Sequence, residues 1–119
     1  MEYYKYRVEL LEEAKSLLDN LDVKTRKKIM YNIWKARSTN DRELFKKLHN
    51  EIWEFRTLYN QTNYRLFAFW DKSENTDTIV ISTHGMIKKT DKTPKSEIEH
   101  AESLRVKYFN EKPKENENI

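Results

Sequence analysis

The fold is decided by the stretch THGMIKKTDKTP, residues 83–94, which joins a predicted strand to a predicted helix. The β-branched residues 78–81 before it predict a buried strand, and the stretch contains the single glycine of the chain, Gly85. Three lysines follow within five residues, and the stretch ends at Thr93-Pro94. Thr93 suits a helix N-cap, and Pro94 suits the first helical position, where a missing N–H costs no hydrogen bond. The pattern therefore predicts a strand, a tight turn, a cationic loop and a helix. Such a loop either binds a polyanion or is simply solvated.

The composition fits one small domain without disulfides or membrane spans. At 119 residues the chain suits a single domain, which we expect over residues 1–109, with residues 110–119 as a disordered tail. The absence of cysteine excludes disulfides, a thiolate nucleophile and cysteine metal sites. No apolar run approaches the ~20 residues that span a bilayer. The N-terminus lacks a secretory signal, so we expect a cytoplasmic protein that binds no membrane. The net charge of +3 is modest, but residues 88–95 carry four lysines and one aspartate.

Hydrophobic periodicity along the chain predicts an α+β fold. Two helical segments meet at Asp22, which can cap the second of them; the apolar side of that helix is expected to carry Val23, Ile29, Met30, Ile33 and Trp34. The predicted elements are a strand at 2–8, helices at 10–21 and from 23, a short helix at 41–49, strands at 52–59, 64–70 and 78–84, and a helix at 94–108 with Ile98, Ala101, Leu104 and Tyr108 facing inward. An N-terminal strand and a helical hairpin would then pack on an antiparallel meander, which a C-terminal helix follows.

Two arginines on neighbouring predicted strands are the first candidates for chemistry. If the hairpin pairs Tyr59 with Tyr64, Arg56 and Arg65 become diagonal neighbours on one face of the sheet. A slip of one residue would separate them. Two guanidinium groups on one face suit a phosphate, which each can bind through two N–H donors. The alternative is that Glu54 pairs with one arginine while the other lies in water.

Histidine and tyrosine add further candidates. His84 ends the predicted third strand, and histidine is the usual proton carrier near neutral pH, although a single histidine is more often structural. Tyr64 could stack on a base, although aromatic residues at strand spacing more often lie in the core. Glu97 and His100 stand three apart on a predicted helix, as in half of a carboxylate-bridged metal site. The sequence has no second such pair, and we expect no metal or cofactor.

Three motifs together resemble one known protein family. IWEFR at residues 52–56, YRLFAFW at 64–70 and HGMIKKTDKTP at 84–94 resemble the phage-derived, HigB-type branch of the RelE/ParE toxin superfamily. The most specific motif is the lysine-rich KKTxKTP before a helix start of the form xxEIxxA, here residues 95–101. The resemblance covers residues 3–108 approximately, and Phe55 is a conservative departure, since leucine is common at that position.

The resemblance implies a RelE-like fold and a toxin of a type II toxin–antitoxin pair. Such toxins are typically small cytoplasmic endoribonucleases, which often cut mRNA in the ribosomal A site. A protein antitoxin neutralises them, frequently a helix-turn-helix repressor. The motif positions give the catalytic candidates Arg56, Arg65 and His84, and the RNA-binding candidates Tyr64, Lys88, Lys89 and Lys92.

These residues suggest a metal-independent mechanism in which the RNA 2′-OH attacks the adjacent phosphate. The arginines would hold the scissile phosphate, the lysines would hold flanking phosphates or ribosomal RNA, and His84 or a lysine would be the general acid or base. Two alternatives stay open: a ParE-like toxin that acts on DNA gyrase without cutting nucleic acid, and an inactive member that only binds a partner.

Overall fold

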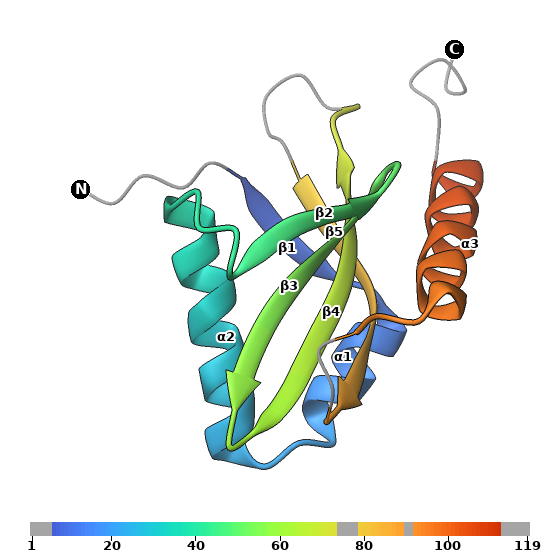
Figure 1. The fold of residues 1–119 in the computed structure, drawn as a ribbon. Coiled ribbons are helices and arrows are strands. Elements are labelled where there is room, and N and C mark those ends of the chain that lie inside the picture. The colour runs from blue at the N-terminus through green and yellow to red at the C-terminus, as the bar shows by residue number, and fades with distance from the viewer. Residues whose placement is uncertain (1–5, 74–78, 90–91, 113–119) are drawn as a thin grey trace.

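A computed structural model describes residues 6–73, 79–89 and 92–112, and within them a five-stranded mixed sheet lies between helices (Figure 1). The elements are β1 (Arg7–Leu10), α1 (Glu12–Asp19), α2 (Val23–Ser38), β2 (Phe45–His49), β3 (Ile52–Tyr59), β4 (Thr62–Asp71), β5 (Ile79–Lys88) and α3 (Lys95–Glu111). The strand order is β1-β5-β4-β3-β2, with β1 parallel to β5 and the other neighbours antiparallel. The predicted α+β class and the C-terminal helix are confirmed. None of the described helices is long and apolar enough to cross a membrane.

The two faces of the sheet are covered by different helices, which we call the α1/α2 face and the α3 face (Figure 1). The α1/α2 face is the larger apolar core, where Ile29 and Ile33 of α2 pack with Phe55, Leu66 and other side chains. On the α3 face, smaller apolar groups surround Phe67 and Phe69. That face also carries the buried ionisable side chains Glu54, Arg65, Asp71 and His84.

The β3–β4 hairpin is tighter than predicted. Tyr59 pairs with Thr62 rather than with Tyr64, so the turn has two residues, Asn60 and Gln61, with φ angles of 50° and 61°. Positive φ at both central positions matches the right-handed twist of the flanking strands. Side chains alternate with a period of two, so the error of two residues leaves every side chain on its predicted face.

The prediction of a short helix at residues 41–49 is wrong. Residues Phe45–His49 form the edge strand β2, which pairs antiparallel with β3. The Phe45 ring stacks on Trp53 and Phe55, with ring centroids 4.9 and 4.2 Å away. Strand pairing and aromatic packing with the next strand, β3, thus override the helical spacing of Leu44 and Leu48.

The predicted turn at Gly85 is also wrong, because β5 continues to Lys88 and Gly85 pairs with Leu66 inside the sheet. A Cβ atom on Gly85 would lie 2.8 Å from the Arg65 carbonyl oxygen and 2.8 Å from Leu66 Cδ2. The glycine is therefore needed for a close approach of two strands. Pro94, and not Thr93, occupies the N-cap of α3, and Thr93 donates a hydrogen bond elsewhere.

Helix α2 is rotated relative to its predicted orientation. Asp22 caps it as predicted, accepting a hydrogen bond from the Thr25 N–H, and Ile29 and Ile33 are buried as predicted. Three further residues predicted to face inward are exposed instead: Val23, Met30 and Trp34. Polar and small residues take the buried positions, among them Asn32, whose amide donates to Thr57 Oγ1 at 3.0 Å.

The two ends of the domain shift slightly from the predicted boundaries. The first strand is Arg7–Leu10 rather than 2–8, and residues 1–5 lie outside the described residues. Helix α3 continues to Glu111, two residues into the segment predicted as a tail, and residues 113–119 are not described. Ile98, Ala101 and Tyr108 of α3 face the sheet as predicted.

Candidate functional site

A buried carboxylate joins the two candidate arginines. Arg56 and Arg65 lie directly opposite each other on β3 and β4, on the α3 face. Glu54 Oε1 is 2.8 Å from Arg65 Nη1 and 3.4 Å from Arg56 Nε. A guanidinium group can be buried only with such compensation, since an isolated charge is very costly out of water. The expected convergence on one face is found, whereas the alternative that Glu54 leaves one arginine in water is wrong.

The two arginines differ in exposure. The Arg65 side chain is 2% exposed, whereas that of Arg56 is 20% exposed. Arg65 Nη2 also donates to Asn63 Oδ1 at 3.4 Å. Arg65 is thus held mainly by protein groups, and Arg56 is the arginine that a ligand reaches more easily.

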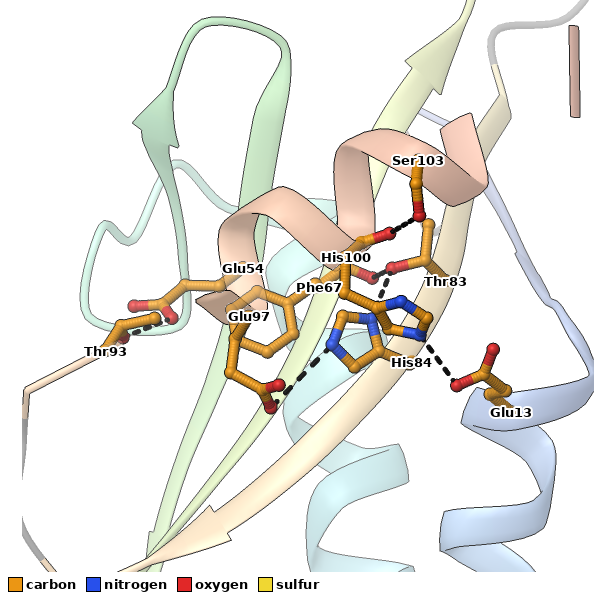
Figure 2. Close-up of polar contacts among 9 residues, drawn as sticks. All are labelled: Glu13, Glu54, Phe67, Thr83, His84, Thr93, Glu97, His100 and Ser103. Atoms are coloured by element: carbon orange, nitrogen blue, oxygen red, sulfur yellow. Dashed lines mark hydrogen bonds and ion pairs between the residues drawn. The ribbon is translucent and has the colours of Figure 1, made fainter. Parts of the chain in front are cut away.

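Glu54 also connects the sheet to the segment before α3. The Thr93 hydroxyl donates to Glu54 Oε2 at 3.3 Å (Figure 2), whereas Oε1 is the oxygen that contacts the two arginines. This contact joins residues 39 positions apart in sequence. The carboxylate therefore ties the sheet to the start of α3.

The arginines border an open hollow of about 380 Å³, which we call the basic hollow. Its lining residues are Glu43, Arg56, Thr57, Leu58, Asn63, Arg65 and Lys89. Lys88 pairs with Asn63 across β4 and β5, which brings it to the same end of the sheet. Lys92 is exposed in the segment before α3, and the structure does not place it in the hollow. Three cationic side chains and one carboxylate at one surface depression suit a phosphate group.

Tyr64 is not brought together with the arginines. It lies next to Arg65 in β4 and packs against the apolar core of the α1/α2 face. Adjacent residues of a strand point to opposite faces, so the Tyr64 ring and the Arg65 guanidinium group lie on different sides of the sheet. The structure thus favours the core interpretation of this tyrosine.

His84 lies beneath α3 and does not line the basic hollow (Figure 2). Its ring stacks on Phe67 with centroids 4.8 Å apart, and the His100 ring meets it edge-on at 4.5 Å. The Thr83 hydroxyl is 3.1 Å from Nδ1, and Glu97 Oε2 is 3.8 Å from Nε2. Burial, together with the nearby His100, lowers the pKa of His84 to about 4, against a smaller opposing effect of Glu13. His84 is therefore neutral at pH 7 and covered by the protein, which suits a structural role.

Four residues that line the basic hollow had not been singled out from the sequence as functional: Glu43, Thr57, Leu58 and Asn63. Glu43 falls in the segment predicted as a helix, and Asn63 in the segment predicted as a loop, so their neighbours could not be inferred. Glu54 had been recognised only as a partner for one arginine, although alternation along β3 places it on the same face as Arg56.

The comparison with known families now adds to this geometry. The model of the Gp49-like family of phage-derived proteins matches residues 16–106, most of the chain and all of the site described above. The chain belongs to the Gp49-like family. The search of curated proteins found no match. The Gp49-like family is RelE-like and toxin-like, and this membership implies an antitoxin partner.

Proposed function

We propose that this Gp49-like protein is a HigB-type toxin, an endoribonuclease that cleaves mRNA and inhibits translation in the cytoplasm. The observation that carries the proposal is the convergence of Arg56, Arg65 and Lys89 on one open hollow. Cations clustered at a depression suit the sugar–phosphate backbone of RNA. Contacts with phosphate groups would bind RNA without base specificity. Lys88 and Lys92 extend the positive charge toward flanking phosphates.

The reaction needs only the chain, its RNA and water. The 2′-OH gives up its proton, the 2′-oxygen attacks the adjacent phosphorus, and the bond from phosphorus to the 5′-oxygen breaks. The departing 5′-oxygen takes up a proton from water in the open hollow, which leaves a cyclic phosphate and a 5′-hydroxyl group. Arg56 and Lys89 stabilise the negative charge that develops on the phosphate. Arg65, held by Glu54, supplies a fixed positive potential behind Arg56, and a preorganised charge costs no reorganisation during the reaction.

A proton acceptor for the 2′-OH is also required. Glu43 fits this role because it is the acidic residue among those that line the basic hollow, whereas His84 lies between the Phe67 and His100 rings under α3. A general base must come within hydrogen-bond reach of the proton that it removes. We therefore assign the proton acceptor to Glu43 rather than to His84.

The antitoxin that family membership implies is proposed to be a small helix-turn-helix protein. The antitoxin would neutralise the toxin until the antitoxin itself is degraded. Cleavage would take place on mRNA at the ribosome, where the lysines also contact ribosomal RNA.

The test is RNA cleavage by purified Arg56→Ala protein. Loss of one charge-stabilising donor should lower the cleavage rate about 100- to 1000-fold. Arg105→Ala is the matched control, since Arg105 is bonded to Glu102 on α3, with Nε–Oε1 at 2.6 Å, and does not line the hollow. Circular dichroism checks that both variants fold. A wild-type rate in Arg56→Ala would refute the proposal, and DNA damage that precedes translation arrest on induction would favour a gyrase-directed toxin.

The base assignment has its own test. Glu43→Gln should slow cleavage about 100-fold or more, because general base catalysis contributes roughly 10²- to 10⁴-fold. His84→Gln should keep most of the activity once its folded fraction is taken into account. If His84→Gln slowed cleavage more than Glu43→Gln, the proton acceptor would be His84 and not Glu43.

A further inference from the structure

Helix α2 carries a second apolar stripe that faces away from the sheet. Its members are exposed to solvent: Val23 by 53%, Met30 by 44%, Tyr31 by 51% and Trp34 by 36%. At 100° per residue, Val23, Met30 and Trp34 fall within about 40° of one another around the helix axis. The buried Ile29 and Ile33 lie on another side of the same helix. Large apolar side chains aligned along an exposed helix mark an interaction surface.

The helix that carries this stripe is strongly basic, with Lys27 within the arc of the stripe and the other cations beside it or on other sides. Helix α2 (Val23–Ser38) contains no aspartate or glutamate, and its cationic residues are Lys24, Arg26, Lys27, Lys28, Lys35 and Arg37. Such a helix repels a like-charged surface and attracts an acidic one. The charge thus selects the partner, while the apolar stripe provides the area to bury.

A second copy of the chain does not suit this surface, because two α2 helices in contact would oppose six cations with six cations. RNA suits it less well than protein does. Val23 and Met30 offer no aromatic plane for a base. The Tyr31 ring already packs against Trp34 at 5.6 Å and lies 5.7 Å from Lys28 Nζ. The combination of an apolar stripe and basic residues on one helix suits packing against an amphipathic, acidic helix.

We infer that the exposed face of α2 docks an amphipathic helix of a partner protein, with apolar residues at three- and four-residue spacing and glutamate or aspartate beside them. Helix α2 lies on the α1/α2 side of the sheet (Figure 1), and none of Val23, Met30, Tyr31 and Trp34 lines the basic hollow, whose arginines lie on the α3 side. A partner bound there leaves the hollow uncovered. The inference holds whether or not the chain cleaves RNA.

The experiment uses the full chain and a synthetic helical peptide of about 18 residues, similar in length to α2. The peptide carries leucine at the apolar positions and glutamate elsewhere, and its counterpart carries lysine in place of glutamate. Because the chain has no cysteine, Met30→Cys offers a unique site for a fluorophore on the stripe, and Val106→Cys offers one on the exposed side of α3. Anisotropy of a labelled peptide measures binding to the unlabelled protein, and the two labelled proteins report where the peptide lies.

The glutamate peptide should bind at least tenfold more tightly than the lysine peptide, and more weakly as salt is raised. Val23→Glu and Tyr31→Glu should each weaken binding about tenfold or more, whereas Val106→Glu, at a position 45% exposed on α3, should leave it unchanged. Only the label at position 30 should respond. Equal binding of both peptides would overturn the inference. So would a dimer that Val23→Glu disrupts, or single-stranded RNA that competes with the peptide at the position-30 label.

Discussion

The α1/α2 face and the α3 face of the sheet are built from different chemistry. The α1/α2 face buries mainly aliphatic and aromatic side chains, with Ala14, Leu18, Ile33, Phe55 and Leu66 all below 5% exposure. The α3 face buries charged groups in contact with one another. Glu54 contacts Arg65, and Asp71 accepts hydrogen bonds from Tyr108 Oη and from Lys112 Nζ at 2.6 Å.

The difference separates stability from function within one sheet. The free energy of apolar burial does not depend on precise contact geometry, because it follows the area removed from water. Buried ion pairs depend on geometry and give little net stability, yet they fix the positions of charges. The α3 face thus keeps Arg56 and Arg65 in place beside the basic hollow, and the α1/α2 face supplies most of the free energy that holds them there.

The largest effect is expected on the charged face. Glu54→Ala leaves the buried Arg65 without its carboxylate and should lower the free energy of unfolding by about 3–5 kcal/mol. Urea denaturation measures the change. The double variant Glu54→Leu with Arg65→Leu should recover much of the loss, because an apolar pair carries no unpaired charge. A single variant as stable as the wild type would mean that the ion pair does not organise this face.

The matched change on the apolar face is Leu66→Ala, at a position 1% exposed. The cavity it leaves should cost about 3 kcal/mol, within the range for large-to-small core substitutions. Leu58→Ala, at a position 66% exposed on β3, is the control and should stay within about 0.5 kcal/mol of wild type. The folded fraction of Leu66→Ala should keep its RNA affinity, whereas that of Glu54→Ala should not. This result would show most clearly that the two faces have different roles.

Gly85→Ala tests the close contact between β4 and β5 on the α1/α2 face. The added Cβ would lie 2.8 Å from the Arg65 carbonyl oxygen, a backbone atom that cannot rotate away. Overpacking of this kind should cost about 1–3 kcal/mol, measured by thermal or urea unfolding. The displacement of β4 should also reduce cleavage through Arg65. An unchanged stability would show that the strands separate here without strain.

Acid should weaken the α3 face through His84. Its pKa falls from the ordinary 6.5 to about 4 on folding. The unfolded chain therefore takes up a proton first as the pH drops. The contribution of neutral His84 to the free energy of unfolding is present above about pH 6.5. It should fall by about 2 kcal/mol between pH 7 and pH 5.

Urea unfolding at both pH values measures the acid effect, and His84→Gln should reduce it. Other ionisable groups face the His84 ring: His100 and Glu97 from α3 and Glu13 from α1. His100→Gln is therefore the companion variant. If His84→Gln keeps the full pH dependence, the loss belongs to one of these neighbours.

The positions that the sequence predicted correctly are those governed by local periodicity. Alternation along residues 52–59 placed Arg56 on the face opposite to Phe55, and a register error of two residues did not alter this. Asp22 was predicted as a cap because a capping side chain acts within three residues. The motifs also indicated the toxin-like family that the matched Gp49-like model supports.

The chain's own sequence determined its class, the alternation of its strand faces and the shared face of both arginines, because these follow from repeating patterns a few residues long. Tertiary structure alone decided that β2 is a strand, that Gly85 serves a close strand contact, that Glu54 engages both arginines, and that His84 lies beneath α3. Each of these depends on a partner in another strand or helix, such as Trp53 for Phe45 or Glu97 for His84. No local pattern records such partners, because burial and pairing are set by how the whole chain packs.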